Sequence, residues 1–113
     1  MLIKEKGIFA EILPVFQSGI LTTTTRSEST HNIYLMNRDD YFNQSKIDFS
    51  KAINKQENVL NSYMESQCFS KPLVVVIKND CDKPIEVSLT LEHTEQRRIF
   101  ASAFSGTNPF AEL

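Results

Sequence analysis

The sequence has only three glycines and only two cysteines among its 113 residues, and each scarcity excludes a class of protein. Loops that hold phosphates need glycines close together, and Gly7, Gly19 and Gly106 lie far apart in the chain. Neither a P-loop nor a dinucleotide-binding fingerprint can therefore be assembled. We expect no nucleotide enzyme of the common types and no cofactor.

The two cysteines, Cys68 and Cys81, are too few for a small secreted domain held together by disulfides. They flank the apolar segment Leu73–Lys78, which as a strand would be about 20 Å long. A disulfide requires Cα atoms within roughly 7 Å. Residues 1–6 also lack the basic-then-apolar order of a secretory signal. We therefore predict two free thiols and a reducing, cytoplasmic location.

Long apolar runs and blocks of like charge are also missing. The longest apolar run, Leu73–Ile77, has five residues, whereas a membrane-spanning helix needs about 20. The net charge is −2, and the densest basic pair, Arg97-Arg98, closely follows two acidic residues, Glu92 and Glu95. We therefore predict neither a membrane span nor a nucleic-acid partner, because binding to phosphates needs a basic surface.

Segments typical of β-strands occupy much of the chain. Several alternate apolar and polar residues or are rich in β-branched residues, which is the pattern of antiparallel strands. The predicted strands are 8–16, 20–25, 32–36, 73–78, 85–92 and 99–104. The last three are joined by short connections, which predicts an antiparallel meander. Residues 26–30 are expected to form a polar loop.

Two segments are expected to be helical. Asn37 can cap a turn that continues to Phe42. In residues 49–64 most apolar side chains fall within an arc of about 140° when placed on a helix, with Gln56 as the polar exception. These elements predict a mainly β, small antiparallel β-sandwich of about six strands with one helix. The alternative is an α+β fold, a single antiparallel sheet with the helix packed across it.

The predicted sandwich has open edges. Pro14 cannot donate a hydrogen bond to a ladder, so its strand is expected at an edge or a bulge. The strand 32–36 is the second edge candidate. We expect one domain over residues 1–104 and a flexible tail over 105–113.

The tail contains Asn108-Pro109-Phe110, which resembles the tripeptide ligand of eukaryotic EH domains. The resemblance covers three residues and implies that Phe110 would occupy a pocket of such a partner. The alternative is that Phe110 packs on the surface of its own domain.

Nucleophilic catalysis would have to use Cys68 with His31 or His93. A thiol needs an imidazole within hydrogen-bonding distance and a third group that orients it. The alternative is that the thiols are small core residues and both histidines lie at the surface. No zinc site is expected, because structural zinc ligands come in close pairs, and the two cysteines and two histidines of this chain lie far apart in the sequence. Asp80 and Asp82, with Asn79, form a weak calcium candidate that lacks ligands.

Aromatic and charged residues gather around the short helical turn, and tyrosine and arginine are enriched in recognition surfaces. The candidate binding residues are Tyr34, Arg38, Asp39, Tyr41, Phe42 and Phe110. The alternative is that the aromatic ones belong to the core. Because no catalytic group is assembled, the preferred hypothesis is a non-enzymatic module that binds a protein or a second copy. The alternatives are a cysteine-dependent hydrolase or transferase and a compact protein inhibitor of an enzyme.

Overall fold

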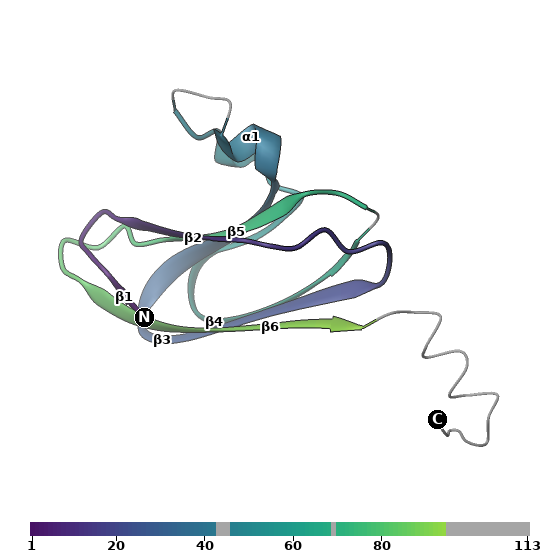
Figure 1. Cartoon of the computed structure of the whole chain (residues 1–113). Coiled ribbons are helices and arrows are strands. Elements are labelled where there is room, and N and C mark those ends of the chain that lie inside the picture. The colour runs from purple at the N-terminus through teal and green to yellow at the C-terminus, as the bar shows by residue number, and fades with distance from the viewer. Residues whose placement is uncertain (43–45, 69, 95–113) are drawn as a thin grey trace, which may run out of the picture.

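The computed structural model describes residues 1–42, 46–68 and 70–94, and these form a mainly β domain (Figure 1). Its six strands belong to one antiparallel sheet in the order β1-β6-β3-β5-β2, with β4 paired to β3. The prediction of a mainly β, antiparallel fold of about six strands with one helix is confirmed, and the strands of the predicted sandwich form one nearly closed sheet. The elements are β1 (Leu2–Ile3), β2 (Ile8–Ile12), β3 (Ile20–Asn37), α1 (Arg38–Phe42), the 3₁₀ turn η1 (Phe49–Lys51), β4 (Asn54–Gln67), β5 (Leu73–Lys78) and β6 (Ile85–Thr94).

The long strand β3 organises the sheet. Along one edge it pairs with β4, and along the other edge it pairs first with β6 and then with β5. Between these two parts the register with β4 shifts around Arg26 and His31. The sheet bends there, so that its β6 half lies opposite its β5 half (Figure 1). The result is a nearly closed, barrel-like sheet.

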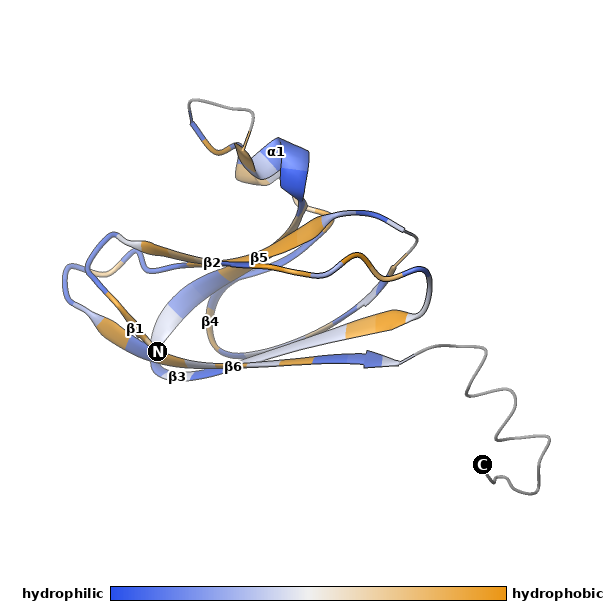
Figure 2. Cartoon of the chain, viewed as in Figure 1, coloured by the Kyte–Doolittle hydropathy of each residue, from blue (hydrophilic) through white to orange (hydrophobic). Residues whose placement is uncertain are grey.

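Two apolar clusters stabilise this arrangement. The larger one fills the space between the two halves of the sheet. Its buried members are Ile3, Leu13, Leu21, Ile33, Leu35, Met64, Cys68, Leu73, Val75, Ile77, Ile85 and Val87. The smaller one lies on the outer face of β3 and β5, where Tyr41, Ile47, Phe49 and Ala52 pack against it. β5 is therefore apolar on both faces, as Figure 2 shows.

A buried asparagine holds the start of β2 in place. The Asn79 side chain is fully buried and donates to the carbonyl oxygens of Ile3, Lys4 and Lys83 at 3.1, 3.0 and 2.9 Å. Its own carbonyl oxygen accepts from the N–H of Cys81 at 2.8 Å. This one amide joins the β1–β2 turn to the β5–β6 loop and closes one side of the barrel.

The predicted helix over 49–64 is wrong, because only Phe49–Lys51 is helical and Asn54–Gln67 is strand β4. Asn is a poor helix former, and Asn58 adopts a left-handed φ of 57° where the strand bends. Beyond the bend, buried Ser62 and Met64 alternate with exposed neighbours, which is the period of a strand. The short helix after Asn37 is confirmed as α1.

The connections between strands also differ from the prediction. Segments 20–25 and 32–36 are parts of one strand, β3, and 32–36 is central because it pairs with both β4 and β5. The meander is wrong as well, because β5 and β6 each pair with β3 and not with each other. The expected strand 99–104 and the tail 105–113 lie outside the described residues.

Candidate functional site

The structure does not bring the three candidate catalytic residues together. His31 is buried and its ring nitrogens lie 2.7 Å from Thr25 Oγ1 and 3.2 Å from the Ser29 carbonyl oxygen. His93 contacts the Ser18 carbonyl oxygen through Nε2 at 2.6 Å. Among the described residues, neither imidazole makes a hydrogen bond to the Cys68 thiol.

The environment of Cys68 does not activate it. Burial raises the pKa of the thiol above its ordinary value, whereas a catalytic cysteine needs a lowered pKa to form the thiolate. Both cysteines are free thiols, as predicted. The arrangement therefore gives the cysteine-dependent mechanism no geometric support.

His31 instead belongs to a buried polar chain. Thr25 Oγ1 lies 2.5 Å from Ser62 Oγ and 2.7 Å from His31 Nε2. Because the Ser29 carbonyl can only accept, Nδ1 carries a hydrogen, and the other nitrogen faces the Thr25 hydroxyl. These contacts join β3 to β4 beside the bend and explain how polar groups are tolerated there.

The calcium candidates are engaged elsewhere. The Asp80 carboxylate accepts from Asn32 Nδ2 at 2.8 Å and lies 3.2 Å from Lys78 Nζ. Asp82 lies 3.4 Å from Lys6 Nζ. Within the part of the chain that the structure describes, no three His, Cys, Asp or Glu side chains gather as metal ligands would.

The predicted aromatic patch divides between core and surface. Tyr34 is buried, stacks on Phe49 with ring centroids 4.2 Å apart, and donates to Glu57 Oε2 at 2.7 Å. Tyr41 packs against the outer cluster and meets Phe42 edge-on, and Phe42 is 55% exposed. Of the charged pair beside them, Arg38 is half-buried and Asp39 is exposed. Phe110 lies outside the described residues.

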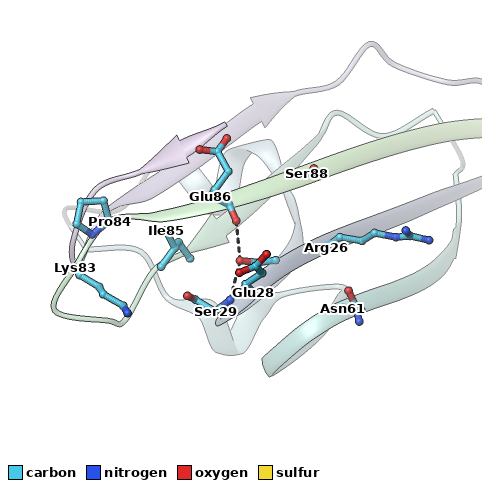
Figure 3. A pocket seen from close by; sticks show the side chains of 10 residues that line it. Arg26, Glu28, Ser29, Asn61, Lys83, Pro84, Ile85, Glu86 and Ser88 are labelled. Atoms are coloured by element: carbon cyan, nitrogen blue, oxygen red, sulfur yellow. Dashed lines mark hydrogen bonds between the residues drawn. The ribbon is translucent and has the colours of Figure 1, made fainter.

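A hollow of about 610 Å³ lies beside the bend of β3 (Figure 3). Both signs of charge line it, with Arg26 and Lys83 against Glu28 and Glu86. The Ser27 hydroxyl, which could have faced a ligand, donates to the Glu86 carbonyl at 2.7 Å. The hollow therefore has a polar lining without one evident ligand chemistry.

The edge of β2 presents main-chain hydrogen-bonding groups at the surface. Among the residues that the structure describes, β2 ends the strand order and pairs only with β5. The Leu13 N–H donates to the Leu73 carbonyl, and the Gly7 carbonyl accepts from the Asn79 N–H, so these two residues face β5. In an antiparallel pair every second residue does so. The N–H and C=O groups of Ile8, Ala10 and Ile12 therefore point away from the sheet.

Apolar groups accompany these outward main-chain groups. Ile8 and Ile12 are 41% and 49% exposed. A second hollow of about 280 Å³ adjoins the start of the strand. Its lining residues are Leu2, Ile3, Lys4, Ile8, Phe9 and Pro84. The strand predicted over 8–16 ends at Ile12, before Pro14, and of the two predicted places, an edge or a bulge, it takes the edge among the described residues.

The free edge of β4 is different because the strand closes it with its own side chains. The Gln56 amide donates to the Tyr63 carbonyl at 3.1 Å and accepts from the Tyr63 N–H at 3.3 Å. Asn54 Nδ2 donates to Ser66 Oγ at 3.1 Å. The bend at Asn58 makes these contacts possible by turning the first part of β4 toward the second.

No family model matches the chain, and no curated protein matches it. Among the described residues, no helix has the length and apolar character that crossing a bilayer requires. The candidate site therefore comes from the structure. The sequence had pointed to it only through Pro14, and the spacing of Ile8 and Ile12 was the further signal that could have identified the exposed face.

Proposed function

We propose that this protein is a non-enzymatic interaction module that binds an extended segment of a protein partner at the edge of β2. The carrying observation is that the main-chain groups of Ile8, Ala10 and Ile12 point outward beside two exposed isoleucines. Added strands gain affinity from main-chain hydrogen bonds and specificity from pockets for side chains. The small apolar hollow beside Ile8 supplies such a pocket.

The side chains of β2 support binding at this edge. Protein edges that avoid pairing usually carry lysine, proline or a bulge. Within β2 the only charged residue is Glu11, and Pro14 lies beyond the strand's end. A compact inhibitor of an enzyme would be one form of this function, with the enzyme supplying the extended segment.

The test is a nuclear magnetic resonance titration of the full chain with a synthetic peptide of alternating valine and threonine and lysine at both ends. Strand addition should shift and protect the amides of Ile8, Ala10 and Ile12. Ile12→Lys should weaken binding about tenfold or more, because burying an isoleucine contributes about 1.5–3 kcal/mol.

Leu60→Lys on β4 is the matched control, since Leu60 is 48% exposed and Ile12 is 49% exposed. This control should bind the peptide like the unmodified chain. Equal weakening by both substitutions, or amide shifts confined to β4, would contradict the proposal.

A further inference from the structure

We infer that the partner at the β2 edge is a second copy of this chain, paired antiparallel about a twofold axis at Ala10. This inference rests on the proposed function and adds the identity and register of the incoming strand. It follows from the symmetry of the edge itself, because a twofold interface must be complementary to its own surface.

The outward main-chain groups have the symmetry that such a pair requires. Ile8 and Ile12 lie two residues before and two residues after Ala10. In the antiparallel register centred there, Ala10 meets Ala10 of the other copy, and Ile8 meets Ile12. Each of these three pairs exchanges two hydrogen bonds, which gives about six in total.

The side chains suit the same register. Ile8 and Ile12 share a face with Ala10, which packs against the outer cluster, so two exposed isoleucine pairs become covered. Glu11 lies opposite Phe9 of the other copy and not opposite a second Glu11. Like charges directly opposite each other would destabilise a strand pair, and this register contains none.

Both ends of the edge limit the ladder to this length. Pro14 has no N–H and would meet Lys6 of the other copy. Lys6 has a left-handed φ of 54°, and its N–H already donates to the Cys81 carbonyl at 3.2 Å. Beyond Ile12, the 47%-exposed Val15 of each copy runs toward the apolar hollow beside Ile8 of the other. A peptide of unrelated sequence would not be expected to end its ladder at these same positions.

Sedimentation equilibrium of the full chain over a wide concentration range tests the inference. We expect a monomer–dimer equilibrium. Ala10→Pro should abolish the dimer, because it removes the central outward N–H without touching the pairing with β5. Ile12→Lys should raise the dissociation constant about a hundredfold, since a twofold interface contains the substitution twice. Leu60→Lys should leave it unchanged, and thermal unfolding would verify that each variant is folded.

A double variant tests the register. Ile8→Lys and Ile12→Glu should each weaken the dimer, and the two together should restore it, because the introduced ammonium then faces the introduced carboxylate of the other copy. A chain that binds the valine–threonine peptide but stays monomeric would overturn the second copy and leave the proposed function intact. A dimer that survives Ala10→Pro would also overturn the inference, and a chain that neither binds the peptide nor dimerises would overturn both.

Discussion

The edges of β2 and β4 belong to one sheet, yet they present opposite surfaces. At β4, Gln56 occupies the main-chain N–H and C=O of Tyr63 as a neighbouring strand would. At β2, the corresponding groups of Ala10 have no partner among the described residues, and Ile8 and Ile12 are exposed on either side. Edges are where sheets associate with other chains. Within the part of the chain that the structure describes, the β4 edge is therefore satisfied by its own side chains and the β2 edge is unpaired.

The difference follows from how each strand is held. β4 bends at Asn58, whose N–H donates to Asn32 Oδ1 at 2.7 Å, and the bend brings its two parts face to face. β2 has only five residues, and among the described residues none of its side chains hydrogen-bonds to its own outward main-chain groups. A bend thus lets one long strand satisfy its own edge, whereas the outward main-chain groups of the short strand β2 have no partner among the described residues.

The largest expected effect comes from removing the anchor of the open edge. Asn79→Ala deprives the carbonyls of Ile3, Lys4 and Lys83 and the N–H of Cys81 of their partner. We expect a loss of about 3 kcal/mol or more in the free energy of unfolding, since each buried group left unsatisfied costs about 1–3 kcal/mol. Urea denaturation measures this loss.

Asn32→Ala is the matched control for the other edge. Asn32 is a nearly buried amide that donates to Asp80 and accepts from the Asn58 N–H. Hydrogen exchange should quicken around β2 in Asn79→Ala and around the β4 bend in Asn32→Ala. If both variants loosened the same edge, the two edges would not be held independently.

The second effect is the conversion of the closed edge into an open one. Gln56→Leu releases the N–H and C=O of Tyr63, and Leu60 and Tyr63 nearby are already exposed. We expect about 1–2 kcal/mol of destabilisation from two lost hydrogen bonds and new self-association at high protein concentration. Light scattering would detect this association.

Lys55→Leu controls for added apolar surface. It places the same side chain one residue away, and the Lys55 side chain takes no part in the amide contacts of Gln56. Association in both variants alike would show that surface hydrophobicity, and not the freed main chain, is the cause.

Local chemistry explains what the sequence could predict. The strands 73–78 and 85–92 follow from apolar runs and strict alternation, and the edge position of the strand before Pro14 follows from its missing N–H. Partner choice is not local. Nothing within residues 32–36 indicates that both β4 and β5 pair there, so the segment was wrongly expected at an edge.

The error over 49–64 has a related cause. The apolar residues placed on one helical arc serve separate places: Phe49 and Ala52 pack against the outer cluster, and Leu60 and Tyr63 lie exposed on β4. Gln56, the polar exception in that arc, is the residue that closes the edge. Its role depends on the bend at Asn58, which the spacing of apolar residues in the sequence does not reveal.

The smallest expected effect comes from removing a side-chain hydrogen bond that joins the first part of β4 to β3. Buried Tyr34 donates to Glu57 Oε2 at 2.7 Å. Burial, and then the Glu57 carboxylate, raise the pKa of Tyr34 above its ordinary value of 10.0. Tyr34→Phe should lower the free energy of unfolding by about 1 kcal/mol at neutral pH, the usual contribution of one hydrogen bond.

The raised pKa also fixes the sign of the pH dependence. The folded state holds the Tyr34 proton more tightly than the unfolded chain, so its contribution is complete below pH 10 and is lost as the pH rises further. Tyr34→Phe should therefore flatten the alkaline fall in stability. Tyr63→Phe is the control for an exposed phenol, because its equal 2.7 Å contact to Glu65 also raises the pKa of Tyr63, but Tyr63 is 58% exposed and its effect on stability should be smaller. As the pH rises, hydrogen exchange should quicken first at Asn54–Glu57 and only at higher pH in β2. If β2 exchanged faster first, Tyr34 would not be what holds the β4 edge.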